Sequence, residues 1–98
     1  MIDFRFRGSL WLWSGGAAWH FVTVPEDVSQ TIRSFAPDAE RGFRSVRVRA
    51  AIGDTQWRTS LFPDRKSGCY FLPVKKGVRQ SEGMEVGDTV EIALELDA

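Results

Sequence analysis

The chain contains little of what metal sites and disulfide-built folds need. Among its 98 residues there is one cysteine, Cys69, and one histidine, His20. A lone cysteine cannot form an internal disulfide, and the pair falls short of the three or four ligands of a zinc site. The acidic residues are scattered rather than spaced as in a calcium-binding loop. We therefore expect no disulfide, no metal site and no cofactor.

The sequence also lacks an excess of charge and a long apolar segment. Thirteen basic residues balance thirteen acidic ones, so the net charge is zero. Any affinity for nucleic acid or an anionic membrane would then need a local patch. No apolar run approaches the roughly 20 residues that cross a bilayer, and no secretion signal is visible. We expect a cytoplasmic protein that does not bind membranes.

What the sequence does contain is a series of short alternating segments. Apolar and polar side chains alternate, and Gly, Asp and Ser stand between the segments, which is typical of strands joined by turns. Gly53-Asp54 is a candidate two-residue hairpin turn. The six expected strands cover residues 2–13, 17–24, 46–52, 55–62, 69–74 and 86–96.

Two helices are expected between the strands. Val28, Ile32 and Phe35 recur at helical spacing, which predicts an amphipathic helix over 25–36. Residues 75–83 are polar and allow a short helix of at most two turns. A chain of this length supports one modest core, so we expect a single domain over 1–98. The predicted core residues are Phe4, Phe6, Val46, Val48, Trp57, Leu61, Val90 and Ile92.

The hairpin that turns at Gly53-Asp54 brings basic side chains together. Its register places Arg49 opposite Arg58 and Arg47 opposite Ser60 on the outer face. Like charges directly opposite each other destabilise a sheet unless something compensates.

Two kinds of compensation are open for these arginines. Glu91, Glu95 or Asp88 on the neighbouring strand could pair with them, which would stabilise the sheet little. Alternatively, an anionic ligand could be held by several guanidinium groups, joined by a second cluster at Lys75, Lys76 and Arg79. The zero net charge favours internal pairing. The candidate anion-binding residues are Arg47, Arg49, Arg58, Ser60, Lys75 and Arg79.

Large aromatic residues share one face of the first hairpin. Trp11, Trp13 and Trp19 lie there with Phe21. Four rings are more apolar area than an exposed face carries without a purpose. We expect this face to be the core, with the opposite face covered by a helix. The alternative is that the three tryptophans form a ligand groove or a self-association surface.

No catalytic site assembles from the spacing of the reactive residues. His20 has no nucleophile and no orienting group at a supporting distance in the sequence, so we expect a structural histidine. Cys69 is expected to be a small buried or edge residue. We therefore predict no catalytic residue.

Four segments of the chain resemble a bacterial family that is catalogued as a domain of unknown function. They are residues 16–25, 41–48, 57–63 and 87–90. That family occurs alone or fused to a YdeI/OmpD-associated, bacteriocin-protection type domain. The resemblance implies a mainly β fold, a six-stranded double-split β-barrel capped by one good helix and one short helix. This fold class also holds the AbrB and MazE regulators and antitoxins. The family brings no established activity.

These observations favour a small soluble binding or interaction module. Its basic and aromatic residues would bind a small anionic ligand or a protein partner, as a monomer or a homodimer. A nucleic-acid-binding regulator of AbrB type is the alternative, weakened by the zero net charge. An enzyme is the least favoured class.

Overall fold

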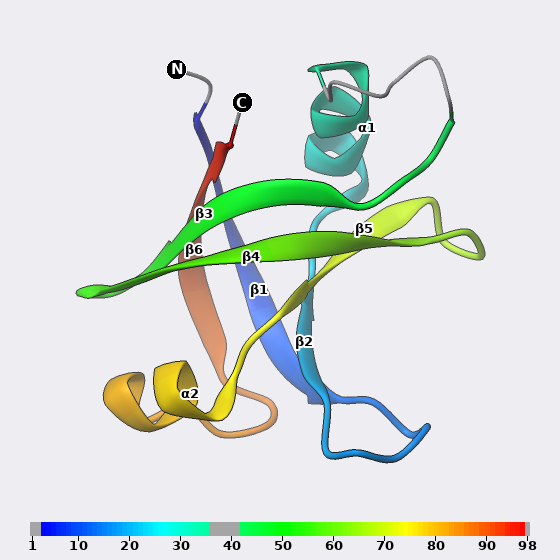
Figure 1. Ribbon diagram of the computed structural model, residues 1–98. Coiled ribbons are helices and arrows are strands. Elements are labelled where there is room, and N and C mark those ends of the chain that lie inside the picture. Colours follow the sequence, from blue (N-terminus) through cyan, green and yellow to red (C-terminus); the bar gives the residue numbers. More distant parts are fainter. Residues whose placement is uncertain (1–2, 36–41, 98) are drawn as a thin grey trace.

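Six antiparallel strands form a closed barrel in the order β1-β2-β5-β4-β3-β6 (Figure 1). The computed structural model describes residues 3–35 and 42–97. The strands and helices confirm the predicted mainly β barrel with one longer and one short helix. The elements are β1 (Asp3–Leu12), β2 (His20–Thr23), α1 (Glu26–Phe35), β3 (Val46–Ile52), β4 (Thr55–Asp64), β5 (Cys69–Pro73), α2 (Lys76–Glu82) and β6 (Thr89–Leu96).

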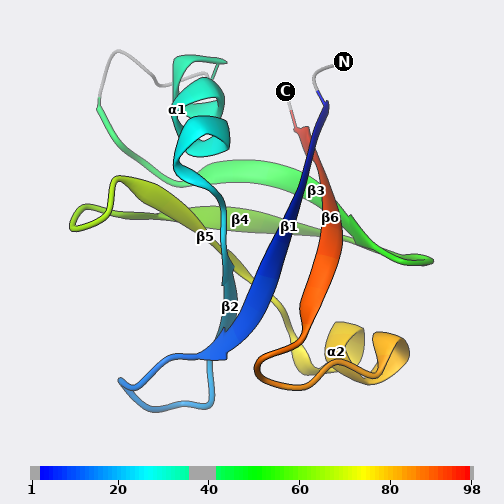
Figure 2. The ribbon, with the colours of Figure 1, turned by 180° about the vertical axis from the view of Figure 1, so that it is seen from behind.

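The two long strands change partner along their length, and this splits the barrel in two places. β1 pairs with β6 over 3–9 and with β2 over 10–12. β4 pairs with β3 over 55–61 and with β5 over 62–64. The two helices lie at opposite ends of the barrel (Figures 1 and 2). One of these splits carries the candidate site.

The two halves of the chain repeat one order of elements, strand, strand, helix, strand. Each half donates the same kind of backbone hydrogen bond to the other. The Val24 N–H donates to the Tyr70 carbonyl at 2.9 Å, and the Val74 N–H donates to the His20 carbonyl at 2.9 Å. β2 and β5 pair between these bonds. The halves are therefore related by an approximate twofold axis, as expected if the chain arose by duplication.

The barrel interior is filled mainly by aliphatic side chains from all six strands. Of the eight predicted core residues, Phe6, Val46, Val48, Trp57, Leu61 and Ile92 are buried. Phe4 and Val90 are only partly buried and pack against this core.

The tryptophan face of the first hairpin is not the core, so that prediction was wrong. Leu10 and Val22, on the opposite face, are 1% and 0% exposed, whereas Trp13 and Trp19 are each 44% exposed. The reason is that β1 closes onto β6 as well as β2. Closure turns the face of β1 that carries Phe6 and Leu10 inward, and Trp11 lies on the other side of the pleat.

The predicted hairpin at Gly53-Asp54 is confirmed in its register. Arg49 is paired with Arg58, and Arg47 with Ser60. Gly53 has φ of 56°, a left-handed conformation that glycine adopts without strain. The outer face of this hairpin therefore does place two arginines side by side.

The first hairpin has a longer loop than expected. Its second strand begins at His20 instead of residue 17, because Ala17 and Ala18 have left-handed φ values of 60° and 50°. In the second half, β4 continues to Asp64, beyond the predicted end at Phe62, because its last residues pair with β5.

α1 packs through a narrower stripe than the sequence predicts. Ile32 and Ser29 are buried, Val28 is partly buried, and Phe35 is exposed. The predicted last helical residue, Ala36, and most of the loop after it lie outside the described residues. Ser29, rather than a third large apolar side chain, completes the contact between α1 and the barrel.

Replacing Trp57 with alanine should lower the free energy of unfolding by about 3–5 kcal/mol, because a large buried ring is lost from the core. Urea unfolding followed by circular dichroism measures the change. Trp13→Ala is the matched control and should cost less than about 1 kcal/mol, because that ring is largely exposed. Equal losses in the two variants would contradict this account of the core.

Ser29→Ala should lower the free energy of unfolding by about 1–3 kcal/mol. The Ser29 hydroxyl donates to the Val24 carbonyl at 3.0 Å and accepts from the Tyr70 N–H at 3.0 Å. Its loss leaves two buried backbone groups without this partner. Ser34→Ala removes an exposed hydroxyl from the same helix and should change the urea midpoint little. A Ser29→Ala protein as stable as wild type would show that the bridge is dispensable.

Candidate functional site

A cleft of about 330 Å³ lies where β4 parts from β5. One wall comes from β4, a second from the junction of β5 and α2, and a third from the loop between β1 and β2. Segments far apart in the sequence therefore meet here. The lining residues are Ala17, Ala18, Trp19, His20, Trp57, Arg58, Thr59, Phe62, Pro73, Val74, Lys75, Lys76 and Arg79.

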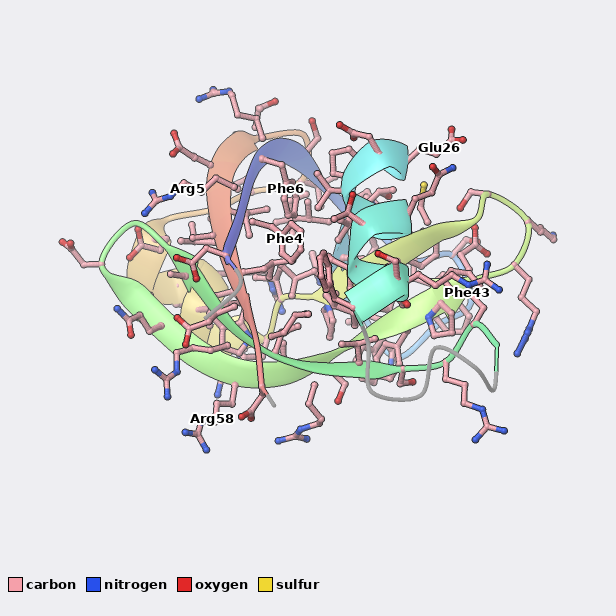
Figure 3. All side chains as sticks on the ribbon, turned by 90° about the horizontal axis from the view of Figure 1, so that it is seen from above. Phe4, Arg5, Phe6, Glu26, Phe43 and Arg58 are labelled. Carbon is pink, nitrogen blue, oxygen red and sulfur yellow. The ribbon has the colours of Figure 1, made fainter. Side chains whose placement is uncertain are left out.

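Cationic side chains surround this cleft. Arg58 comes from β4, Lys75 is the N-cap of α2, and Lys76 and Arg79 belong to α2 itself. Figure 3 shows Arg58 projecting outward from β4, away from the barrel interior. No aspartate or glutamate stands among the described lining residues. Such a one-sided lining attracts anions, because no carboxylate among the described lining residues offsets its positive charge.

Arg79 is anchored on one side of its guanidinium group. Its Nε donates to the Val74 carbonyl at 3.2 Å. Ser29 makes the corresponding bond in the other half, to the Val24 carbonyl. The bond through Nε holds the Arg79 side chain in place, and the terminal nitrogens still carry donors that fit a carboxylate or a phosphate.

Trp19 and Phe62 give the cleft an aromatic wall. The Trp19 ring stacks on Phe21, with centroids 5.7 Å apart and planes 8° apart. Phe62 meets Trp19 edge-on at 6.3 Å. Trp19 and Phe62 are 44% and 38% exposed, so both present apolar surface that a ligand could cover.

The other two candidate tryptophans do not line the cleft. Trp11 packs behind the wall against Phe21 and Phe71, with centroid distances of 5.2 and 4.9 Å. Its indole N–H donates to the Thr23 hydroxyl at 3.0 Å. Trp13 is exposed in the loop. Trp11 therefore supports the wall, and Trp19 alone of the three reaches the cleft.

The loop between β1 and β2 is held over the cleft in a strained conformation. Left-handed residues other than glycine cost about 1–3 kcal/mol each, and Ala17 and Ala18 follow one another here. His20 Nδ1 lies 2.8 Å from the Ala18 carbonyl. A carbonyl oxygen only accepts, so Nδ1 carries the proton in this contact. The imidazole is thus fixed against the loop.

The structure separates the predicted arginine patch into two parts. Arg49 lies 4.0 Å from Glu95, an ion pair that follows from their direct pairing between β3 and β6. Arg49 lines another groove of about 310 Å³, where Asp3, Arg5 and Glu95 mix both signs of charge. Arg49 therefore has an acidic neighbour within the fold.

Arg47 and Ser60 also lie outside the cleft. They are cross-strand partners on β3 and β4, next to the pair of Arg49 and Arg58. Of the six candidate anion-binding residues, the cleft brings together Arg58, Lys75 and Arg79.

The sequence places Trp19 in a candidate ligand groove, but it does not predict that Trp19 and His20 meet the basic cluster. His20 and Trp19 reach the basic cluster because the start of β2 lies beside the end of β5, where Phe21 pairs with Pro73. The signal that could have located them is the internal repeat. Val24 is followed by α1 as Val74 is followed by α2, which matches β2 with β5 as equivalent strands.

Two further observations describe the part of the chain that the structure covers. Neither helix there has the length and apolar character of a membrane-spanning segment. No group of three or more histidine, cysteine, aspartate or glutamate side chains gathers there as a metal site would require.

A closed six-stranded antiparallel barrel with two helices and an open cationic cleft defines a small β-barrel domain. The family model described as "Domain of unknown function (DUF1905)" matches residues 6–94. The chain therefore belongs to this family. A comparison with curated proteins finds no significant match.

The positive charge of Arg58 should lower the free energy of unfolding. Arg58 faces Arg49 directly, so Arg58→Gln should raise the free energy of unfolding by about 0.2–1 kcal/mol, and added salt should reduce the gain. Arg49→Gln is the matched control and should gain less, because it also loses the Glu95 pair. A destabilised Arg58→Gln protein in low-salt urea unfolding would show that Arg58 supports the fold instead.

Proposed function

We propose that this protein is a binding module whose cleft holds an anionic group attached to an apolar or planar moiety. Arg58, Lys76 and Arg79 would bind the anion. Trp19 and Phe62 would cover the apolar part. The protein would act by holding this ligand and would not transform it.

The observation that carries the proposal is the cluster of four cationic side chains in a cleft whose described lining has no carboxylate. Cations held close together repel each other, and a bound anion offsets that repulsion. The aromatic wall beside them adds apolar contact. An open site of this kind should bind in the micromolar to millimolar range, because exposed charge pairs contribute only about 0–1 kcal/mol each.

A catalytic role is less well supported by the same lining. His20 and Thr59 are the side chains there closest to a base and a nucleophile in chemical type. The Ala18 carbonyl orients the His20 imidazole, but no hydrogen bond joins His20 to Thr59 among the described residues, so the hydroxyl has no base within reach. Binding needs only the charges and rings already in place.

A nucleic-acid-binding regulator of AbrB type remains a prediction from the resemblance. Four of the thirteen basic residues line the cleft, and the net charge is zero, which does not favour an extended basic surface for a duplex. If this alternative holds, the logarithm of the affinity for duplex DNA should fall linearly with the logarithm of the salt concentration. The slope should correspond to several phosphate contacts.

Phenyl phosphate is a suitable probe, because it joins a dianion to an aromatic ring. In calorimetric titration at low salt, the Arg58→Ala/Lys76→Ala variant should bind it at least about tenfold more weakly than wild type. Added salt should weaken the wild-type binding. In the amide NMR spectrum, the wild-type shifts should concentrate at 17–20 and 74–79.

The control variant is Arg47→Ala/Lys66→Ala, which removes two exposed cations outside the cleft. It should bind phenyl phosphate as wild type does. Equal losses in both double variants would indicate diffuse surface charge. No loss in either would exclude the cleft as the anion site.

A further inference from the structure

β4 has a property that the proposed function does not use. Over 55–61 it pairs with β3, and its pairing with β5 is confined to 62–64. Among the described strands, none pairs with the second edge of β4 over 55–61. Trp57, Arg58 and Thr59 lie on this stretch and line the cleft. α2 packs beside the start of this stretch, where the Thr55 hydroxyl donates to Glu82 at 2.6 Å. The unpaired edge that borders the cationic site is therefore the part around Arg58 and Ser60.

The hairpin register identifies which backbone groups point to that edge. In a hairpin with a two-residue turn, the residues flanking the turn form a hydrogen-bonded pair, and such pairs alternate along the ladder. Thr55 flanks the turn and pairs with Ile52. The backbone groups of Gln56, Arg58 and Ser60 therefore point away from β3. They offer alternating donors and acceptors, as an unpaired edge does.

The other half of the molecule shows what fills the equivalent end. Tyr70 stands in β5 where His20 stands in β2, by their reciprocal bonds to Val24 and Val74. The ring of Phe43, from the segment that leads into β3, packs on Tyr70 at a centroid distance of 4.9 Å and is buried. At the His20 end there is instead an open cleft.

We propose that the cleft receives an extended acidic peptide segment of a partner protein, which adds to β4 as a further strand. The main chain of the peptide bonds to the free edge at Arg58 and Ser60. Its carboxylates meet the cleft cations, and an aromatic or aliphatic side chain lies against Trp19 and Phe62. This inference rests on the proposed function, because the same cations hold the anionic groups.

The strand edge favours a peptide over nucleic acid. A peptide backbone donates and accepts in alternation, so it can satisfy both the N–H and the carbonyl groups of a β4 edge. A phosphate backbone only accepts, and would leave the edge carbonyls without donors. Charge complementarity then selects acidic over basic segments, because the described cleft lining carries only positive charges.

The probe is the peptide Glu-Val-Glu-Phe-Glu-Val-Glu-amide, labelled with fluorescein at its N-terminus. Two further copies are N-methylated on the backbone. One carries the methyl groups at the three apolar residues, and the other carries them at three of the four glutamates. In an added strand, one alternating set of N–H groups faces β4 and the other faces solvent. One N-methylated copy should therefore bind at least about tenfold more weakly than the parent, and the other should bind nearly as well.

Fluorescence anisotropy at low salt measures these affinities with the unaltered protein. The glutamine version of the peptide and the Arg58→Ala/Lys76→Ala protein should each weaken binding at least about tenfold. Arg47→Ala/Lys66→Ala should bind the parent peptide as wild type does.

Several results would overturn the inference. If both N-methylated copies bind like the parent, or both lose affinity equally, no strand is added to β4. If phenyl phosphate binds the cleft but the peptide does not, the proposed function stands and the peptide partner is rejected. If an oligothymidylate binds more tightly than the peptide, the partner is nucleic acid. If neither phenyl phosphate nor the peptide binds, both proposals fall.

Discussion

The pairing of β2 with β5 is the interaction on which the rest of the molecule depends. The ladder is short, and the reciprocal bonds of Val24 with Tyr70 and of Val74 with His20 extend it at both ends. It closes the ring of strands between the two halves of the chain. The same pairing sets the loop before β2 beside the start of α2. Closure of the core and assembly of the cleft are thus one event.

The cleft exists because the two halves have diverged around a common frame. At one end, Ser29 is a small neutral group that can be buried, and Phe43 covers Tyr70. At the other end, Arg79 makes the corresponding carbonyl bond, and His20 stands in the place of Tyr70. A guanidinium group resists burial unless it is paired, so this end stays open. Apolar filling at one end stabilises the barrel, and the other end is left for binding.

How much of the structure could be predicted from the sequence depends on how local each sequence signal is. A two-residue turn determines register, so the pairing of Arg49 with Arg58 could be predicted from the hairpin alone. The inner face of β1 could be predicted where Phe6 stands between charged residues, but not at its end, because Leu10 and Trp11 are both apolar and alternation does not tell there which one turns inward. The meeting of Trp19 with Lys75 depends on β2 pairing with β5, for which neither strand carries a local signal.

The double role of β6 has a consequence for how the protein is made. β6 pairs with β1 on one side and with β3 on the other. Until that strand has left the ribosome, both partners expose apolar faces and unpaired edges, the features that lead nascent chains to aggregate. The barrel cannot close progressively as it is translated. Its folding must wait for the end of the domain, so a chain stalled before β6 would be a substrate for chaperones rather than a partly folded barrel.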